Sequence, residues 1–225
     1  MQPPRSDLSG LIRAVTARYT GASRHTRWYV ASKLRRDPAN AAILALAARP
    51  GGFGMVADLG CGRGQLGLAL LLAGGARSVL ALDRDGPKLR EAEAAAAGLP
   101  ARFAVADLAQ GRLPSCDTAL LVDVLYQLPE AEQRDLLRRA GDAARRRLVI
   151  RAFDPDAGWR STVGHVMEWL NRALRGDARR AAIRPMPLPA LRALLEGQGF
   201  LVTATPCWGS TPLPNVLVLA ERRAA

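Results

Sequence analysis

A carboxylate and three glycines at alternate positions have the types and spacing of a ligand-binding turn. Asp58 lies at the end of the short apolar run 55–59, and Gly60, Gly62 and Gly64 follow it. Glycine lets a backbone approach a ligand where a Cβ would collide. A buried-helix pattern begins after Gly64, and the free N–H groups of its first turn can face the same ligand. The spacing differs from that of a pyrophosphate-binding turn, and no Lys-Ser/Thr pair follows it as in a P-loop.

Acidic residues also end the next apolar runs. Residues 78–83 form a second run that ends in Asp83, and a carboxylate at that position accepts hydrogen bonds from both hydroxyls of an adenosine ribose. Asp107 follows a third run, and Asp123 ends a fourth. The pattern predicts a nucleoside-type ligand at the carboxyl ends of parallel strands.

Asp58 to Gly64, Asp83 and Ala106-Asp107-Leu108 together resemble the motifs of class I S-adenosylmethionine-dependent methyltransferases. The resemblance covers roughly residues 54–151. It implies an enzyme that uses S-adenosylmethionine and releases S-adenosylhomocysteine. The cofactor-binding residues that it implies are Asp58, Gly60, Cys61, Gly62, Gly64, Gln65, Asp83, Arg84, Asp107, Leu108 and Asp123.

Three of these assignments have open alternatives. Asp58 would neutralise the cationic end of the cofactor's methionine, or would only cap the turn. Asp107 would take the adenine amino group, with the Leu108 N–H on a ring nitrogen, or would only shape a turn. Arg84 would lie against the adenine or be solvated.

The elements that must position these residues alternate along the chain. Apolar strands are expected at 55–59, 78–83, 102–106, 118–123 and 147–151, and helices at 65–73, 86–97, from about 129, and at 188–196. Two last strands, 200–203 and 216–219, are too close for a crossover helix and should pair antiparallel. We expect an α/β fold with a seven-stranded, mostly parallel, doubly wound sheet, which is the Rossmann-like fold that the resemblance implies.

Two segments fall outside this alternation. Residues 1–50 predict an N-terminal helical cap, with a helix near 6–20, a stretch of aromatic and basic residues, and a helix that Asp37 caps. Residues 51–225 form the expected methyltransferase domain, in which 154–186 is a helical insertion after the fifth strand on the acceptor side. We expect the cap and the insertion to cover the carboxyl edge, where ligands of such sheets bind.

Composition limits the class of protein and its partners. Hydrophobic residues make up 49% of 225 residues and charged ones 23%, as in a soluble globular protein. The first residues lack the apolar core of a signal peptide, so we expect a cytoplasmic protein, with a position at the membrane surface left open. Cys61, Cys116 and Cys207 lack metal-ligand spacing, which predicts reduced thiols and no metal site.

The net charge of +12 lies in the flanks. Residues 1–50 carry +7, residues 51–125 carry −1, and residues 126–225 carry +6. All four tryptophans also lie in the flanks, at Trp28, Trp159, Trp169 and Trp208. An acidic carrier protein or an anionic membrane surface would suit this distribution, although 30 of the 32 basic residues are arginine, which a GC-rich genome alone can explain.

The acceptor is the part that the sequence identifies least. Methyl transfer needs alignment and, for hydroxyl acceptors, a base. His25 and His165, the only histidines, lie in the cap and the insertion, and histidine generally titrates near neutrality. Each is a candidate base or a surface histidine. Tyr126, after the fourth strand, is a third candidate catalytic residue, and otherwise a pocket wall or a core residue.

Two other functions are alternatives to methyl transfer to a small-molecule, lipid-like or carrier-bound acceptor. The charge suggests an RNA methyltransferase. However, Asp123-Val124-Leu125-Tyr126 lacks the two prolines that base-amino methylases place after the fourth strand. Pyrimidine C5 methylases need a Pro-Cys nucleophile near that strand, whereas Pro206-Cys207 lies in the closing hairpin. The second alternative is a non-catalytic S-adenosylmethionine-binding protein, but all the binding motifs are intact, so nothing in the sequence supports degeneration of an enzyme. A second resemblance, of residues 151–160 and 209–217, is to bacterial methyltransferases found with aryl-polyene or fatty-acid-type biosynthesis.

Overall fold

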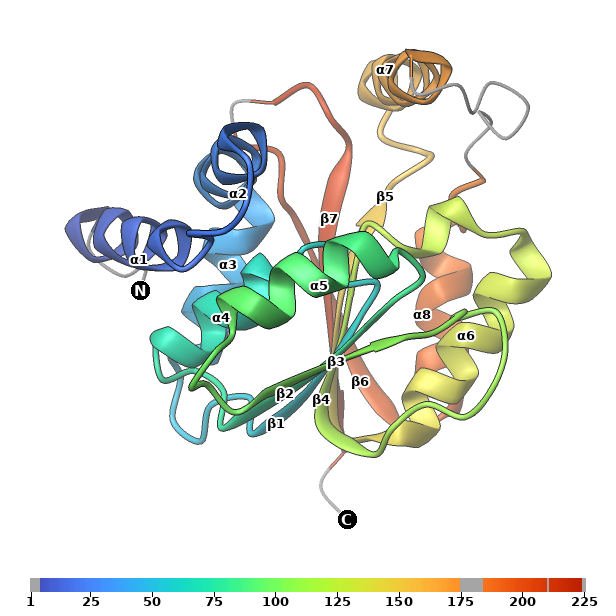
Figure 1. Cartoon of the computed structure of the whole chain (residues 1–225). Coiled ribbons are helices and arrows are strands. Elements are labelled where there is room, and N and C mark those ends of the chain that lie inside the picture. The colour runs from blue at the N-terminus through green and yellow to red at the C-terminus, as the bar shows by residue number, and fades with distance from the viewer. Residues whose placement is uncertain (1–4, 175–183, 210, 224–225) are drawn as a thin grey trace.

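The fold is one seven-stranded sheet between two layers of helices. A computed structural model describes residues 5–174, 184–209 and 211–223. The strand order is β3-β2-β1-β4-β5-β7-β6, in which β7 runs antiparallel to both of its neighbours and the other pairs are parallel (Figure 1). The strands are β1 (Met55–Leu59), β2 (Ser78–Asp83), β3 (Ala101–Val105), β4 (Cys116–Val122), β5 (Ala144–Phe153), β6 (Phe200–Pro206) and β7 (Asn215–Arg222). The predicted mostly parallel α/β sheet is therefore confirmed.

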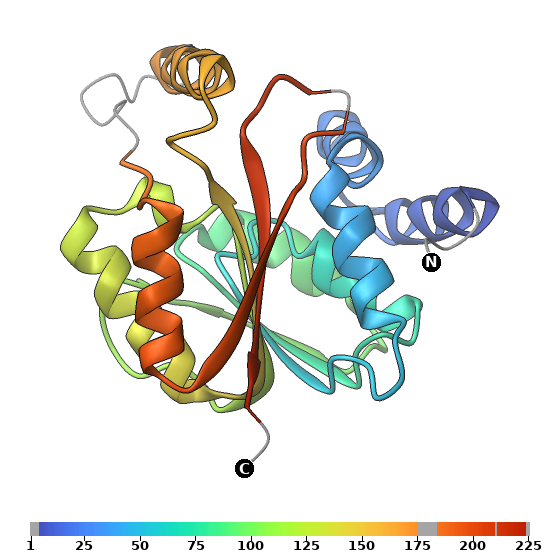
Figure 2. The ribbon, with the colours of Figure 1, turned by 180° about the vertical axis from the view of Figure 1, so that it is seen from behind.

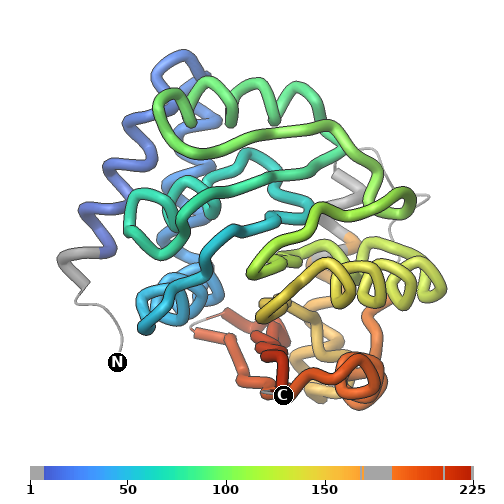
Figure 3. Tube along the Cα trace, turned by 90° about the horizontal axis from the view of Figure 1, so that it is seen from below, coloured from blue at the N-terminus to red at the C-terminus, as the bar shows by residue number. Residues whose placement is uncertain are grey.

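The two faces of the sheet carry different helices. The helices are α1 (Arg5–Ala17), α2 (Arg24–Arg36), α3 (Pro38–Ala47), α4 (Gln65–Leu72), α5 (Gly86–Ala95), the 3-10 turn η1 (Leu125–Gln127), α6 (Glu130–Ala143), α7 (Trp159–Leu174) and α8 (Leu188–Gly197). Seen from below, the N-terminal helices lie on the left and α6 and α8 on the right (Figure 3). None of the described helices has both the length and the apolar character that crossing a bilayer requires.

Alternating side chains on the central strands build two cores. On β4, Leu120 packs with the helices α1 to α5, while Ala119 and Leu121 pack with α6 and α8. A strand buried on both faces needs such a continuous apolar run. The cap shares the first core, since Val15 and Ile43 belong to the same cluster as Leu68 of α4. The boundary at residue 50 stays a prediction.

The cap is helical, as predicted, but it also contains α2, where the sequence pattern predicted only a stretch of aromatic and basic residues. Ser23 caps α2, because its Oγ accepts a hydrogen bond from Thr26 N at 3.1 Å. Asp37 caps α3 in the same way, with Ala39 N at 3.1 Å, and Pro38 occupies the first turn. The predicted first helix is shorter than expected, because α1 ends at Ala17.

Helix α2 of the cap and helix α7 project beyond the same edge of the sheet, on opposite sides of it (Figures 1 and 2). The hairpin tip, which we define as residues 207–209 and 211–214, joins them. Gly209 packs against Pro38, so closely that a Cβ there would lie 2.5 Å from Cγ of the proline. On the other side, Nη1 of Arg160 in α7 donates to the Thr211 carbonyl at 2.8 Å. The closing hairpin was predicted, but this bridging role of its tip was not.

Candidate active site

The turn after β1 uses its three glycines in two different ways. All three have positive φ, +82° at Gly60, +58° at Gly62 and +70° at Gly64. A Cβ at Gly60 would lie 2.3 Å from Cγ2 of Val124, and one at Gly64 would lie 2.7 Å from Cε1 of Phe103. At Gly62 a Cβ would meet open space. Two glycines therefore allow close packing, and the third keeps a surface of the turn free for a ligand.

Asp58 is the buried carboxylate behind this turn. Its side chain is 3% exposed, and its Oδ2 has no hydrogen-bond partner within the described part of the chain. Burial, and then the charge of Asp83, raise the pKa of Asp58 to about 7. Oε1 of Gln65, at the start of α4, is likewise buried and unpaired among the described residues. Two acceptor atoms thus lack a donor, which is a costly arrangement unless a ligand supplies one.

Asp83 holds the turn in shape and keeps capacity for a ligand. Its Oδ2 accepts from Gly62 N at 2.7 Å, and its Oδ1 accepts from Asp85 N at 2.9 Å. A carboxylate has about four lone-pair sites, so two remain for the hydroxyls of a ribose. The Leu82 carbonyl adds to the turn by accepting from Gly60 N at 2.7 Å and Cys61 N at 3.0 Å.

The remaining predicted cofactor residues surround the turn with less defined roles. Asp107 is exposed, and its Oδ1 accepts from Ala109 N at 3.0 Å, which is the arrangement of a turn aspartate. The Leu108 carbonyl accepts from Arg139 Nη2 at 2.7 Å. Arg84 is exposed. Burial raises the pKa of the Cys61 thiol strongly, so it is a neutral side chain. The adenine contacts of this group stay predictions.

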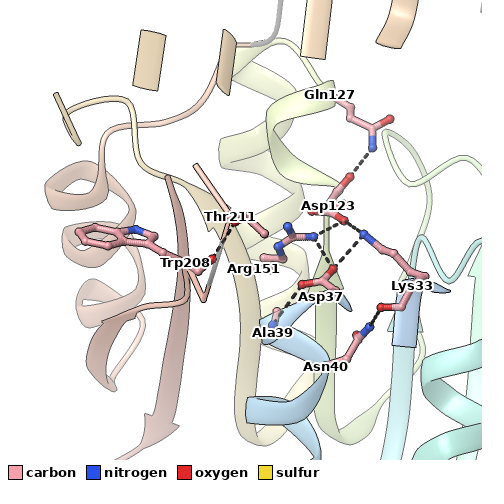
Figure 4. Close-up of polar contacts among 9 residues, drawn as sticks. All are labelled: Lys33, Asp37, Ala39, Asn40, Asp123, Gln127, Arg151, Trp208 and Thr211. Carbon is pink, nitrogen blue, oxygen red and sulfur yellow. Dashed lines mark hydrogen bonds and ion pairs between the residues drawn. The ribbon is translucent and has the colours of Figure 1, made fainter. Parts of the chain in front are cut away.

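Asp123 belongs to an ion-pair quartet, which we define as Lys33, Asp37, Asp123 and Arg151, and in which Asp37 and Arg151 are buried and Lys33 and Asp123 are half-buried (Figure 4). Lys33 Nζ lies 2.9 Å from Oδ2 of both aspartates. Arg151 Nη1 lies 2.8 Å from Oδ2 of Asp37 and 2.5 Å from Oδ2 of Asp123. Two cations therefore balance two carboxylates, as burial of charge requires. The quartet ties the cap to the ends of β4 and β5.

Asp123 also has an unusual backbone. Its φ of +61° is the only positive value at a non-glycine residue among those described, and this region disfavours residues with a Cβ. Burial raises its pKa, but Arg151 and then Lys33 outweigh that and hold the pKa at about 2. Asp123 is therefore ionised and is a poor proton acceptor. The sequence placed it among the cofactor residues, a role that stays a prediction.

An aromatic cluster, defined as Tyr126, Phe153 and His165, lies beside the quartet. The ring centroids of Tyr126 and Phe153 are 6.2 Å apart, and those of Phe153 and His165 are 4.9 Å apart. Gly164 lets α7 pack on Phe153, because a Cβ there would lie 2.6 Å from its ring. A side-chain hydrogen bond joins Tyr126 to Asp123 and helps to lower the pKa of that aspartate. The other candidate base, His25, is exposed on α2 and faces Trp28 at 6.3 Å.

Comparison with known proteins decides the class. Residues 56–146 match the family model described as methyltransferase domain. The chain contains a methyltransferase domain. The matched span runs from β1 into β5 and holds the glycine turn, Asp58 and Asp83, so the resemblance seen in the sequence is confirmed and the cofactor is S-adenosylmethionine. No curated protein matches the chain.

Solved structures share the fold of this methyltransferase. A magnesium protoporphyrin IX methyltransferase from Synechocystis PCC 6803, with bound S-adenosylhomocysteine, is 20% identical, with a TM-score of 0.66 over 94% of each chain. An O-methyltransferase family protein from Burkholderia thailandensis is 16% identical, with a TM-score of 0.67 over 89% of this chain and 60% of that one. At these identities the likeness shows the fold, and the acceptor has to be inferred from the site itself.

The residues present fit the cofactor of the methyltransferase. When bound, S-adenosylmethionine supplies a methyl group on a cationic sulfonium. A cationic ligand matches the unpaired, buried Oδ2 of Asp58, and an amino group matches Oε1 of Gln65. The open space at Gly62 leaves room for ligand atoms against the turn.

The sequence missed a set of contacts by which the cap holds the glycine turn of the methyltransferase. The Tyr19 hydroxyl donates to the Arg63 carbonyl, inside the turn, at 2.6 Å. The Arg63 guanidinium forms an ion pair with Glu91, whose Oε1 also accepts from Thr26 Oγ1 at 3.3 Å. Tyr19 is 1% exposed, and burial raises the pKa of its hydroxyl. Its position four residues after Val15, on the same apolar stripe, was the available signal.

Proposed function

We propose that this methyltransferase transfers a methyl group from S-adenosylmethionine to a small-molecule or lipid-like acceptor, free or bound to a carrier protein. The observation that carries the proposal is the aromatic cluster at the ends of β4 and β5. Tyr126 is half-buried and His165 is exposed, so the cluster reaches the surface. The cluster and Asp83 lie on opposite sides of the central strand β1, because Asp83 ends β2 and the cluster lies at the ends of β4 and β5. Aromatic side chains there would hold an apolar acceptor and exclude water from the transfer.

The cofactor roles that we propose follow from the geometry of the turn. Asp58 would neutralise the cationic methionine end, because it is the buried carboxylate without a donor. Asp83 would accept the ribose hydroxyls with its remaining lone pairs. Asp107 and the Leu108 N–H would contact the adenine, beyond the end of β3.

We propose His165 as the base for an acceptor hydroxyl. Asp123, with a pKa of about 2, binds protons too weakly for this task. The Tyr126 hydroxyl already bonds to that carboxylate. His165 is the exposed member of the cluster, while His25 lies on α2 of the cap, against Trp28.

The test identifies the acceptor class and the base in turn. Labelled cofactor is incubated with the protein and with separated lipid, metabolite, carrier-protein and RNA fractions, and the labelled product is identified. Once an acceptor is known, His165→Ala should lower kcat by roughly 10²-fold or more and remove one limb of the pH profile. His25→Ala is the matched control and should keep full turnover. Label in RNA alone would overturn the proposed acceptor class.

The described site gives no support to a cysteine nucleophile of the kind that pyrimidine C5 methylases use. Cys207, after Pro206, is buried, and burial raises the pKa of its thiol. A nucleophilic cysteine needs a lowered pKa. The net positive charge of the flanks therefore remains the one feature that favours a nucleic-acid acceptor.

A further inference from the structure

Helix α7 has its apolar side chains on the outside. Trp159, Val166, Met167 and Trp169 are 63%, 52%, 39% and 53% exposed. At 100° per residue these four positions fall within one half of the helix surface. The opposite side carries small residues, such as Gly164, which packs on Phe153 and Pro214 of the fold. A helix with this pattern is built to place its apolar side against something other than its own sheet.

Helix α2 adds a second outward face at the same edge. Trp28 is 61% exposed, and Arg24 and Arg35 lie on the same side of the helix, four and seven residues away. Thr26, Val30 and Leu34 form the buried side. The helix contains five basic residues and no acidic one. Both views along the sheet show α2 and α7 projecting beyond the same edge (Figures 1 and 2).

We infer that the outward faces of α2 and α7 together bind the surface of an anionic lipid bilayer. Tryptophan places an apolar ring and a polar N–H at the boundary between headgroups and acyl chains. The basic side chains beside it attract anionic headgroups. We define this docking face by Arg24, Trp28, Arg35, Trp159, Val166, Met167 and Trp169. The Arg160 guanidinium, 4.8 Å from the Trp159 ring centroid, adds a positive charge at its border.

Charge favours the bilayer over a second copy of the chain. Residues 1–50 carry a net charge of +7, so two such faces would repel each other. The large exposed apolar residues elsewhere, Val105 on β3 and Leu201 on β6, stand singly on strands. Of the seven large exposed apolar residues in the described part of the chain, five lie on these two helices, at the edge where the acceptor would enter.

The experiment measures sedimentation of the full chain with vesicles. Wild-type protein should bind phosphatidylglycerol-containing vesicles, bind pure phosphatidylcholine at least tenfold more weakly, and lose affinity as salt rises. The double variant Trp159→Ser/Trp169→Ser should bind at least tenfold more weakly, and so should Arg24→Glu/Arg35→Glu. Val105→Ser/Leu201→Ser removes two equally exposed apolar residues and should bind as the wild type does.

Each contrary result is distinguishable from failure of the proposed function. Cofactor affinity, measured by calorimetry, should be the same in all four proteins, which separates loss of docking from damage to the site. Equal sedimentation of the tryptophan double variant and the control would overturn the inference. So would binding to an acidic carrier protein without binding to vesicles, or a wild-type dimer that the tryptophan substitutions dissociate.

Discussion

Asp58 should make stability and cofactor affinity respond to pH in opposite directions. Burial and Asp83 raise its pKa from 3.8 to about 7 in the folded protein. In the unfolded chain the group is ionised above about pH 4. Between these two values the folded protein holds a proton that the unfolded chain has lost, so the free energy of unfolding falls as pH rises. Asp58→Asn removes the ionisation and should remove this fall.

The magnitude follows from the size of the shift. Each pKa unit corresponds to about 1.36 kcal/mol. Between about pH 5.5 and pH 7, wild-type protein should therefore lose roughly 2 kcal/mol relative to Asp58→Asn. For a chain of this size, that is a relative change in melting temperature of roughly 4–8 °C. The variant should be the more stable protein above neutrality, because it buries no unpaired charge.

The assay is thermal unfolding without cofactor across this pH range, with Asp156→Asn as the control, since Asp156 is exposed. Calorimetric titration with S-adenosylhomocysteine should show the reverse ranking. Wild-type affinity should rise with pH up to about 7, because binding a cation favours the ionised carboxylate, and Asp58→Asn should bind weakly at every pH. Parallel loss of stability in wild type and Asp58→Asn would refute the reasoning, because Asp58 would then be ionised throughout.

Three further predictions concern the turn and the quartet. Gly62→Ala should cost about 1–2 kcal/mol of backbone strain and weaken cofactor binding at least tenfold in a calorimetric titration. Gly98→Ala, with φ +75° and equally open space, should show the same strain and normal binding. Asp83→Asn should lower cofactor affinity roughly tenfold and move the pH midpoint of Asp58 downward in the unfolding series, since one of the two causes of that shift disappears. Arg151→Met should reduce the free energy of unfolding in urea by about 3 kcal/mol, because the buried Asp37 and the half-buried Asp123 lose their shared guanidinium but keep Lys33.

The cofactor half of the site could be predicted because its signals are local. The expected bounds of β1 and β2, 55–59 and 78–83, are those of the structure. Strand, glycine turn and helix are contiguous in sequence, and register alone brings the ends of neighbouring parallel strands together. The fold class follows from the same alternation of apolar strands and helices.

The quartet could not be predicted because its members are far apart in the chain. Lys33 bonds to a residue 90 positions away, and Arg151 to one 114 positions away. Two weak signals existed. Lys33 is one of only two lysines in a chain that otherwise uses arginine, and Arg151 ends an apolar strand where a charge needs a buried partner.

The difference between signals that are local in the sequence and contacts that form only in the folded chain also explains why the cofactor is identified and the acceptor is not. The acceptor side is assembled from the cap, the ends of β4 and β5, α7 and the hairpin tip, which meet only in the folded chain. Asp123 connects these parts, since it bonds to the cap through Lys33, to β5 through Arg151 and to the aromatic cluster through Tyr126. Its left-handed backbone persists because these three contacts together stabilise it. Asp123 is therefore the carboxylate through which the cap, β5 and the aromatic cluster are joined.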